Sequence, residues 1–149
     1  MADQIFTLQD SEVALVAATA KTIIQTVAPT NHRQKILGWG VFFDGTSVTA
    51  EPVQVELIRQ STAGTSAALT PVKDDDSLAE SILSTARKTF SVEPTSTDII
   101  DVVEVHPQQG YEIMYPLGQE KKVGGGDRVG IRCTAPAGVN VRAKMRIEE

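Results

Sequence analysis

The stretch that decides the fold is the C-terminal one, which reads VNVRAKMRI over residues 139–147. Its odd-numbered positions carry apolar side chains and its even-numbered positions carry polar ones, namely Asn140, Arg142, Lys144 and Arg146. A period of two is that of a β-strand with one buried face and one wet face. A helix would spread these charges around its circumference. The pattern therefore predicts a strand.

Similar patterns upstream predict further strands. Val129, Ile131 and Cys133 alternate with Arg or Gly, and the APAGVN that follows is rich in turn-forming residues. The expected strands cover residues 22–27, 35–43, 53–60, 87–92, 98–105, 111–115, 128–133 and 139–147. This succession of short strands predicts an all-β fold, a jelly-roll-like antiparallel β-sandwich of about eight strands.

One segment favours a helix. Ser77 is followed three residues later by Glu80, which is typical of a capping box, and acidic residues precede it. We therefore expect at most one short helix, over residues 78–85, with an irregular loop as the alternative. The chain divides into an N-terminal arm or first strand, residues 1–19, and a β-sandwich domain, residues 20–149.

Composition limits the class of protein. The chain has 149 residues, which fit one domain, and 14 basic against 19 acidic residues give a net charge of -5. Because binding to a phosphate backbone needs clustered Lys and Arg, we expect no nucleic-acid partner. We expect no membrane partner either, since no apolar run approaches the roughly 18 residues that span a bilayer. The lone Cys133 excludes an internal disulfide, and the N-terminus does not resemble a secretion signal, so synthesis in a reducing cytoplasm is expected.

The GGGD stretch at residues 124–127 raises the question of a phosphate-binding loop. A Walker loop needs Lys and Ser or Thr after its last glycine, whereas Asp127 follows here. The dinucleotide pattern G-x-G-x-x-G also fails, because Val129 stands where the third glycine is required. We interpret the glycines as a tight link between two strands.

No other residue set predicts catalysis or metal binding. His32 and His106 lie in separate turn-like segments, and Cys133 falls on the apolar side of its strand without an evident base. The adjacent aspartates at 74–76 lack the alternate spacing of a calcium loop. We therefore expect no catalytic residue, no bound metal and no cofactor.

An apolar surplus in residues 35–43, KILGWGVFF, predicts an interface. The run is apolar on both faces, so one face needs a cover beyond the core. This makes Trp39 and Phe42 candidates for a subunit contact, with burial in the core as the alternative. Tyr111 and Tyr115 are candidates for the same role or for a shallow ligand surface.

The N-terminal arm offers a second set of interface candidates. Ile5, Phe6 and Leu8 could add a strand to an exposed edge of a neighbouring molecule. The alternative is a frayed terminus.

Four stretches of the sequence resemble one family of phage proteins. They are KTIIQTVAPTNHRQKILGWGVFFDGTSVTAEPVQVELIRQ (21–60), LTPVKDDDSLAE (69–80), VVEVHPQQGYEIMYPLGQE (102–120) and VGGGDRVGIRCTAPAGVNVRAKMRIEE (123–149). Together they are similar to the auxiliary head proteins of tailed bacteriophages, called decoration or cement proteins. The similarity runs from about residue 20 to the end and includes no catalytic signature.

The resemblance implies a structural role. Such proteins form trimers of β-sandwich subunits on the outside of an icosahedral shell, where they bridge neighbouring subunits. The implied partners are the major capsid protein and further copies of the chain itself, and the implied location is the capsid surface of the virion. Three alternatives remain at this point: a carbohydrate- or receptor-binding module of a phage particle, an enzyme on a jelly roll, and the shell-forming protein itself.

Overall fold

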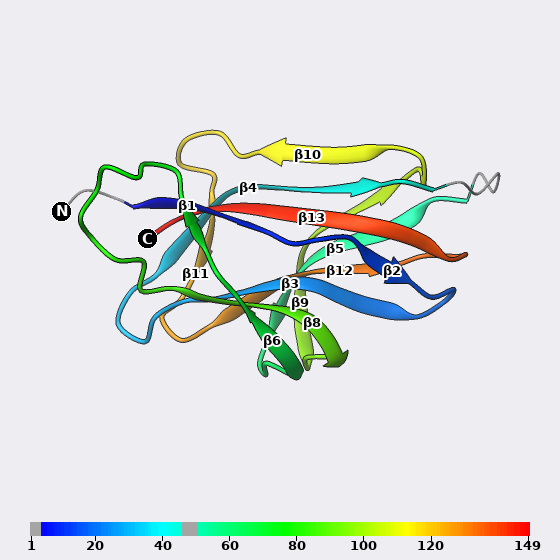
Figure 1. The fold of residues 1–149 in the computed structure, drawn as a ribbon, viewed down its shortest axis with the longest axis horizontal. Coiled ribbons are helices and arrows are strands. Elements are labelled where there is room, and N and C mark those ends of the chain that lie inside the picture. The colour runs from blue at the N-terminus through cyan, green and yellow to red at the C-terminus, as the bar shows by residue number, and fades with distance from the viewer. Residues whose placement is uncertain (1–3, 46–50) are drawn as a thin grey trace.

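The structure is a computed structural model that describes residues 4–45 and 51–149. The chain folds into two antiparallel sheets packed as a sandwich (Figure 1). The described residues contain no helix, and so none that could span a membrane. The predicted all-β sandwich is confirmed. The described residues form thirteen strands in place of about eight, because several short strands add to the expected ones.

The first sheet has seven strands in the order β10-β4-β13-β1-β7, with β11 also beside β4 and β2 also beside β13. Its members are β1 (Ile5–Gln9), β2 (Val13–Leu15), β4 (Gln34–Phe43), β7 (Val72–Lys73), β10 (Gly110–Met114), β11 (Lys121–Val123) and β13 (Val139–Glu148).

The second sheet has six strands in the order β6-β8-β3-β12-β5-β9. Its members are β3 (Ala20–Val27), β5 (Val53–Gln60), β6 (Thr65–Leu69), β8 (Thr85–Val92), β9 (Ser96–Val105) and β12 (Arg128–Thr134).

The core lies between the sheets and follows from alternation along each strand. In β13 the odd-numbered residues are buried, and Val141 and Met145 stand opposite the buried Phe43 and Trp39 of β4. The even-numbered residues point to the other side of the sheet. The period of two therefore decides which face of the first sheet is open to solvent.

The outer face of the second sheet is covered in part by the chain itself. Gln25 and Gln60 are buried there and joined by a 2.7 Å hydrogen bond, and the Gln25 amide also donates to the Thr62 carbonyl at 3.0 Å. Gly130 leaves room for this pair, since a Cβ at Gly130 would lie 2.5 Å from the Gln60 Oε1. A loop that follows β5 thus closes over this face.

The expected helix over residues 78–85 is wrong. Residues 78–84 form an irregular segment, which was the alternative expected, and Thr85 begins β8; polar backbone groups of this segment bond to side chains from elsewhere. Glu149 accepts hydrogen bonds from the backbone amides of Leu83 and Ser84, at 2.7 and 2.9 Å. Ser77 bonds to Asp75 at 2.6 Å in place of capping a helix. Because these partners satisfy the backbone, the segment gains little from a helix.

The first ten residues contribute a strand to the sandwich. β1 pairs with β13 on one side and with β7 on the other, and Phe6 and Leu8 are fully buried between the sheets. Phe6 and Leu8, which were predicted as interface residues, thus lie in the core of this sandwich, where neither has surface exposed to a partner. Ile5 is half-buried and stands opposite Glu148.

The glycine stretch connects the two sheets. It links β11 of the first sheet to β12 of the second, as a turn in which Asp127 N donates to the Gly124 carbonyl at 3.0 Å. Gly126 has a φ of +83° and donates to the Ala28 carbonyl at 3.2 Å, and a Cβ at Gly125 would lie 2.4 Å from the Thr30 carbonyl oxygen. The structural interpretation of the glycines is confirmed.

Candidate functional site on the outer face of the seven-stranded sheet

The candidate site is the outward surface of β10, β4 and β13, which run side by side (Figure 1). Alternation in β4 sends Phe43, Val41 and Trp39 into the core, so Phe42, Gly40 and Gly38 face outward. Phe42 is 40% exposed. The predicted second apolar face is therefore one exposed aromatic ring beside two glycines.

An ion pair spans the sheet above Gly40. In the ladder, Gly40 stands between Glu112 of β10 and Lys144 of β13. The Lys144 Nζ lies 2.7 Å from the Glu112 Oε1 and 5.5 Å from the centre of the Phe42 ring. Because Gly40 has no side chain, the two long side chains meet across the intervening strand.

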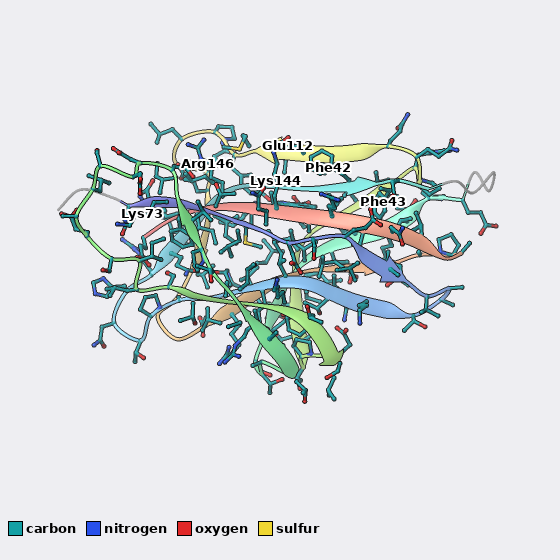
Figure 2. The ribbon with its side chains drawn as sticks, viewed as in Figure 1. Phe42, Phe43, Lys73, Glu112, Lys144 and Arg146 are labelled. Carbon is teal, nitrogen blue, oxygen red and sulfur yellow. The ribbon has the colours of Figure 1, made fainter. Side chains whose placement is uncertain are left out.

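A second ion pair ties the segment after β7 to the same face. Asp74 accepts hydrogen bonds from Arg146 at 2.7 Å and from the Thr7 hydroxyl at 2.8 Å. Figure 2 shows Glu112, Lys144, Arg146 and Phe42 gathered where β10, β4 and β13 adjoin. The charged side chains form two neutral pairs, Lys144 with Glu112 and Arg146 with Asp74. Both pairs are partly open to solvent.

Two shallow grooves flank the Lys144 side chain. The first, here called the Gly38 groove, has a volume of about 390 Å³ and is lined by Thr7, Gly38, Trp39, Asp74, Glu112, Met114, Lys144, Met145 and Arg146. The second, of about 450 Å³, is lined by Gln9, Asp10, Ser11, Phe42, Arg142, Ala143 and Lys144. The outer face can therefore receive a side chain on either side of Lys144.

The predicted interface residues do not all come together here. Trp39 is buried in the core, which was the alternative to a contact role, and its indole packs on Tyr111 with ring centres 5.5 Å apart. Tyr111 and Tyr115 are half-buried and pack against the core. Of the seven predicted interface residues, only Phe42 is exposed, at 40%.

The chemically reactive side chains lie apart. Cys133 is fully buried, and this burial raises the pKa of its thiol, which favours the protonated form. The His106 Nδ1 accepts a hydrogen bond from the Gln108 amide within its own turn. Within residues 4–45 and 51–149, no three His, Cys, Asp or Glu side chains gather as a metal-binding group.

Several residues of the face were not singled out from the sequence. Lys144 and Arg146 were expected only to be exposed to solvent, and Asp74 was considered only within the aspartate run at 74–76. Glu112 and Met114 were not predicted as site residues. The signal for Gly38 and Gly40 is their spacing of two around Trp39, which puts both on one side of the strand. Their partners depend on strand register, which the sequence does not display.

Comparison with known proteins adds no assignment to this geometry. No protein-family model matches the sequence, and no curated protein matches it.

Proposed function

We propose that the chain is an accessory structural protein of a phage virion. It binds as a homotrimer to the outside of the capsid shell and stabilises contacts between major capsid subunits. The observation that carries the proposal is the outer face of the seven-stranded sheet, where Phe42 is 40% and Met114 is 49% exposed beside paired charges. The resemblance of the sequence to phage decoration proteins supplies the partner.

The charges of this face suit burial against protein. An exposed ion pair contributes little to the stability of a single molecule, about 0–1 kcal/mol. The same pairs become useful in a contact, because Lys144 and Arg146 enter it already neutralised by Glu112 and Asp74. A partner that covers them leaves no unpaired charge behind, which is the costly outcome of burying ions.

The mechanism is a clamp repeated over the shell. Packed DNA pushes the shell outward, and a bound oligomer adds contacts that must break before neighbouring capsid subunits separate. Each contact is modest, but an oligomer that engages several subunits at once dissociates only when all of its contacts are lost. The symmetry of the shell repeats this effect at each equivalent position.

A pelleting experiment tests the proposal. The purified chain is mixed with phage shells that lack their accessory protein and, as a control, with shells of an unrelated phage. We expect saturable co-sedimentation with the first shells only, and a higher temperature of shell disruption when the chain is bound. Absence of binding to shells of the phage that encodes the chain contradicts the proposal.

Phe42 supports glycan binding as a second candidate function. Its ring borders the second groove, whose polar residues Gln9, Ser11 and Arg142 could hydrogen-bond to sugar hydroxyls. Exposed aromatic rings present apolar faces of the kind that sugars stack on. Binding of the isolated chain to a glycan array, lost in Phe42→Ala and accompanied by no binding to shells, favours this function over the first.

A further inference from the structure

A rigid turn presents one apolar side chain to solvent. Leu117 is 96% exposed, the largest fraction among the large apolar side chains of the described residues. The turn closes through a 2.9 Å hydrogen bond from Gln119 N to the Pro116 carbonyl, and Gly118 supplies the φ of +87° that it requires. Gly118 N also donates to the Glu120 carboxylate at 2.9 Å. Because the turn is already ordered, Leu117 can enter a partner with little loss of conformational entropy.

The Gly38 groove suits an apolar side chain such as that of Leu117. Its polar rim consists of the Lys144–Glu112 and Arg146–Asp74 pairs, which are neutral as a set. Met114 on its wall has a flexible thioether side chain that adapts to an apolar neighbour. Gly38 gives this thioether room at the groove floor, since a Cβ at Gly38 would lie 2.3 Å from the Met114 Sδ. The uncharged Leu117 side chain, here called the plug, can therefore enter such a groove without separating a charge from its partner.

The charges beside the plug and the groove are complementary. Glu120 flanks the turn. The hydrogen bond from the Gly118 amide lowers the pKa of its carboxyl, and the nearby Lys35 and Lys122 lower it further, so the carboxyl is ionised at neutral pH. Arg146 on the groove rim is half-exposed and uses Nε and Nη2 on a single oxygen of Asp74, so its guanidinium has further N–H groups that can donate to a second carboxylate.

The two features lie on one molecule but do not meet within it. Leu117 follows Met114 by three residues, so the turn begins at the end of the groove, yet its leucine remains open to solvent. We propose that the Leu117 turn of one copy of the chain occupies the Gly38 groove of a second copy. The plug and the groove are different surfaces, so each subunit gives one contact and receives another, as in a closed ring.

This contact rests on the proposed function and deepens it: it assigns the Gly38 groove to the contact between copies of the chain, and it leaves Phe42 and the second groove of the same face for the capsid. The test is sedimentation equilibrium of the full chain and of three variants with matched changes: Leu117→Asp in the plug, Met114→Asp in the groove and Val16→Asp as the control. Val16 is 66% exposed and lies between β2 and β3, outside the residues that line the groove. Thermal unfolding of each variant confirms that the sandwich is retained.

We expect the wild-type chain and Val16→Asp to associate alike, and Leu117→Asp and Met114→Asp to associate about 30-fold more weakly or worse, the loss typical of a hot-spot residue. A mixture of the two weakened variants should associate more strongly than either alone, because the intact leucine of one meets the intact groove of the other. No such recovery, or a wild-type chain that stays monomeric up to its solubility limit, overturns the contact.

Shell binding separates this inference from the proposed function. Association that depends on Leu117, in a chain that binds no shell, supports the contact and contradicts only the virion role. A dimer with the same dependence supports the contact and contradicts only the trimer. A monomer whose shell binding needs Leu117 overturns the contact, because the groove's occupant is then not a second copy.

Discussion

At the residue scale, Tyr115 joins the two sheets through hydrogen bonds. The buried Trp39 of β4 donates its indole N–H to the Tyr115 hydroxyl at 2.9 Å, and this hydroxyl donates to Asp101 of β9 at 3.0 Å. Tyr115→Phe removes the acceptor and leaves the indole N–H unpaired, which we expect to lower the free energy of unfolding by about 1–3 kcal/mol. Tyr111→Phe is the control, because the Tyr111 hydroxyl has no hydrogen-bond partner among the described residues. Equal denaturant midpoints for the two variants would contradict this role.

The same tyrosine makes stability depend on alkaline pH. Burial raises the pKa of Tyr115, and the neighbouring Asp101 raises it further. Above pH about 10, the ordinary pKa of tyrosine, the unfolded chain therefore loses this proton while the folded chain keeps it. Stability falls with rising pH in that range. Part of this slope should be absent in Tyr115→Phe when unfolding is measured between pH 9 and pH 11, in steps of about one unit.

Glu12 provides the corresponding test at acidic pH, with the same sign. A hydrogen bond shared with Asp44 raises the pKa of the Glu12 carboxyl, and Arg142 and the amide of Asn140 offset this only in part. A raised pKa means that ionisation of Glu12 costs stability, so stability falls as pH rises through the range between its unfolded and folded pKa values. We expect Glu12→Gln to unfold at a higher temperature than the wild type at pH 7. The difference in unfolding temperature should vanish at a pH low enough to protonate the carboxyls of both Glu12 and Asp44. A difference that persists at that pH would contradict the linkage.

At the element scale, β4 owes its position to its glycines. A Cβ at Gly38 would lie 2.5 Å from the Ile113 carbonyl oxygen and 2.3 Å from the Met114 Sδ, so Gly38→Ala must push β10 away from β4. Overpacking of this kind costs about 1–3 kcal/mol. Gly138→Ala is the matched control, because its Cβ would meet only the Leu15 carbonyl oxygen at 3.5 Å. Urea unfolding compares them, and equal losses would show that the approach of β10 is not the cause.

Strands with strict alternation could be predicted, and the others could not. β13 and β12 match their patterns because each buries one face, and β5 was located although Glu56 and Ile58 are buried on its second face. β2, β6, β7 and β11 were not predicted, because short strands rarely show a clear period, and β1 was expected only as an arm or a first strand. The expected helix failed because Glu149 and Gln4, remote in sequence, bond to the backbone of its residues.

The candidate site was also only partly predictable, because its pairs join residues that are remote in sequence. The outward direction of Arg142, Lys144 and Arg146 follows from the period of two. Which acid each cation meets depends on the register that sets Gly40 between Lys144 and Glu112, and on the fold that brings Asp74 to Arg146. Long-range pairing of this kind is a property of the whole molecule.

For the whole molecule, β1 decides whether the sandwich closes. It fills the space between β13 and β7, and Phe6 and Leu8 are fully buried. Truncating such side chains to alanine costs about 3–5 kcal/mol for Phe and 2–5 kcal/mol for Leu, against a total stability of about 5–15 kcal/mol for a domain. We therefore expect Phe6→Ala with Leu8→Ala to leave the chain largely unfolded.

The same strand supplies its own control, because Ile5 and Gln9 point outward from it. Ile5→Ala with Gln9→Ala keeps the strand and its ladder but removes no fully buried group, so this pair should retain cooperative thermal unfolding. Circular dichroism of both double variants measures the contrast. If the inward pair unfolded no earlier than the outward pair, the first strand would be dispensable, and an arm that reaches a neighbouring molecule would again become the better account of residues 1–19.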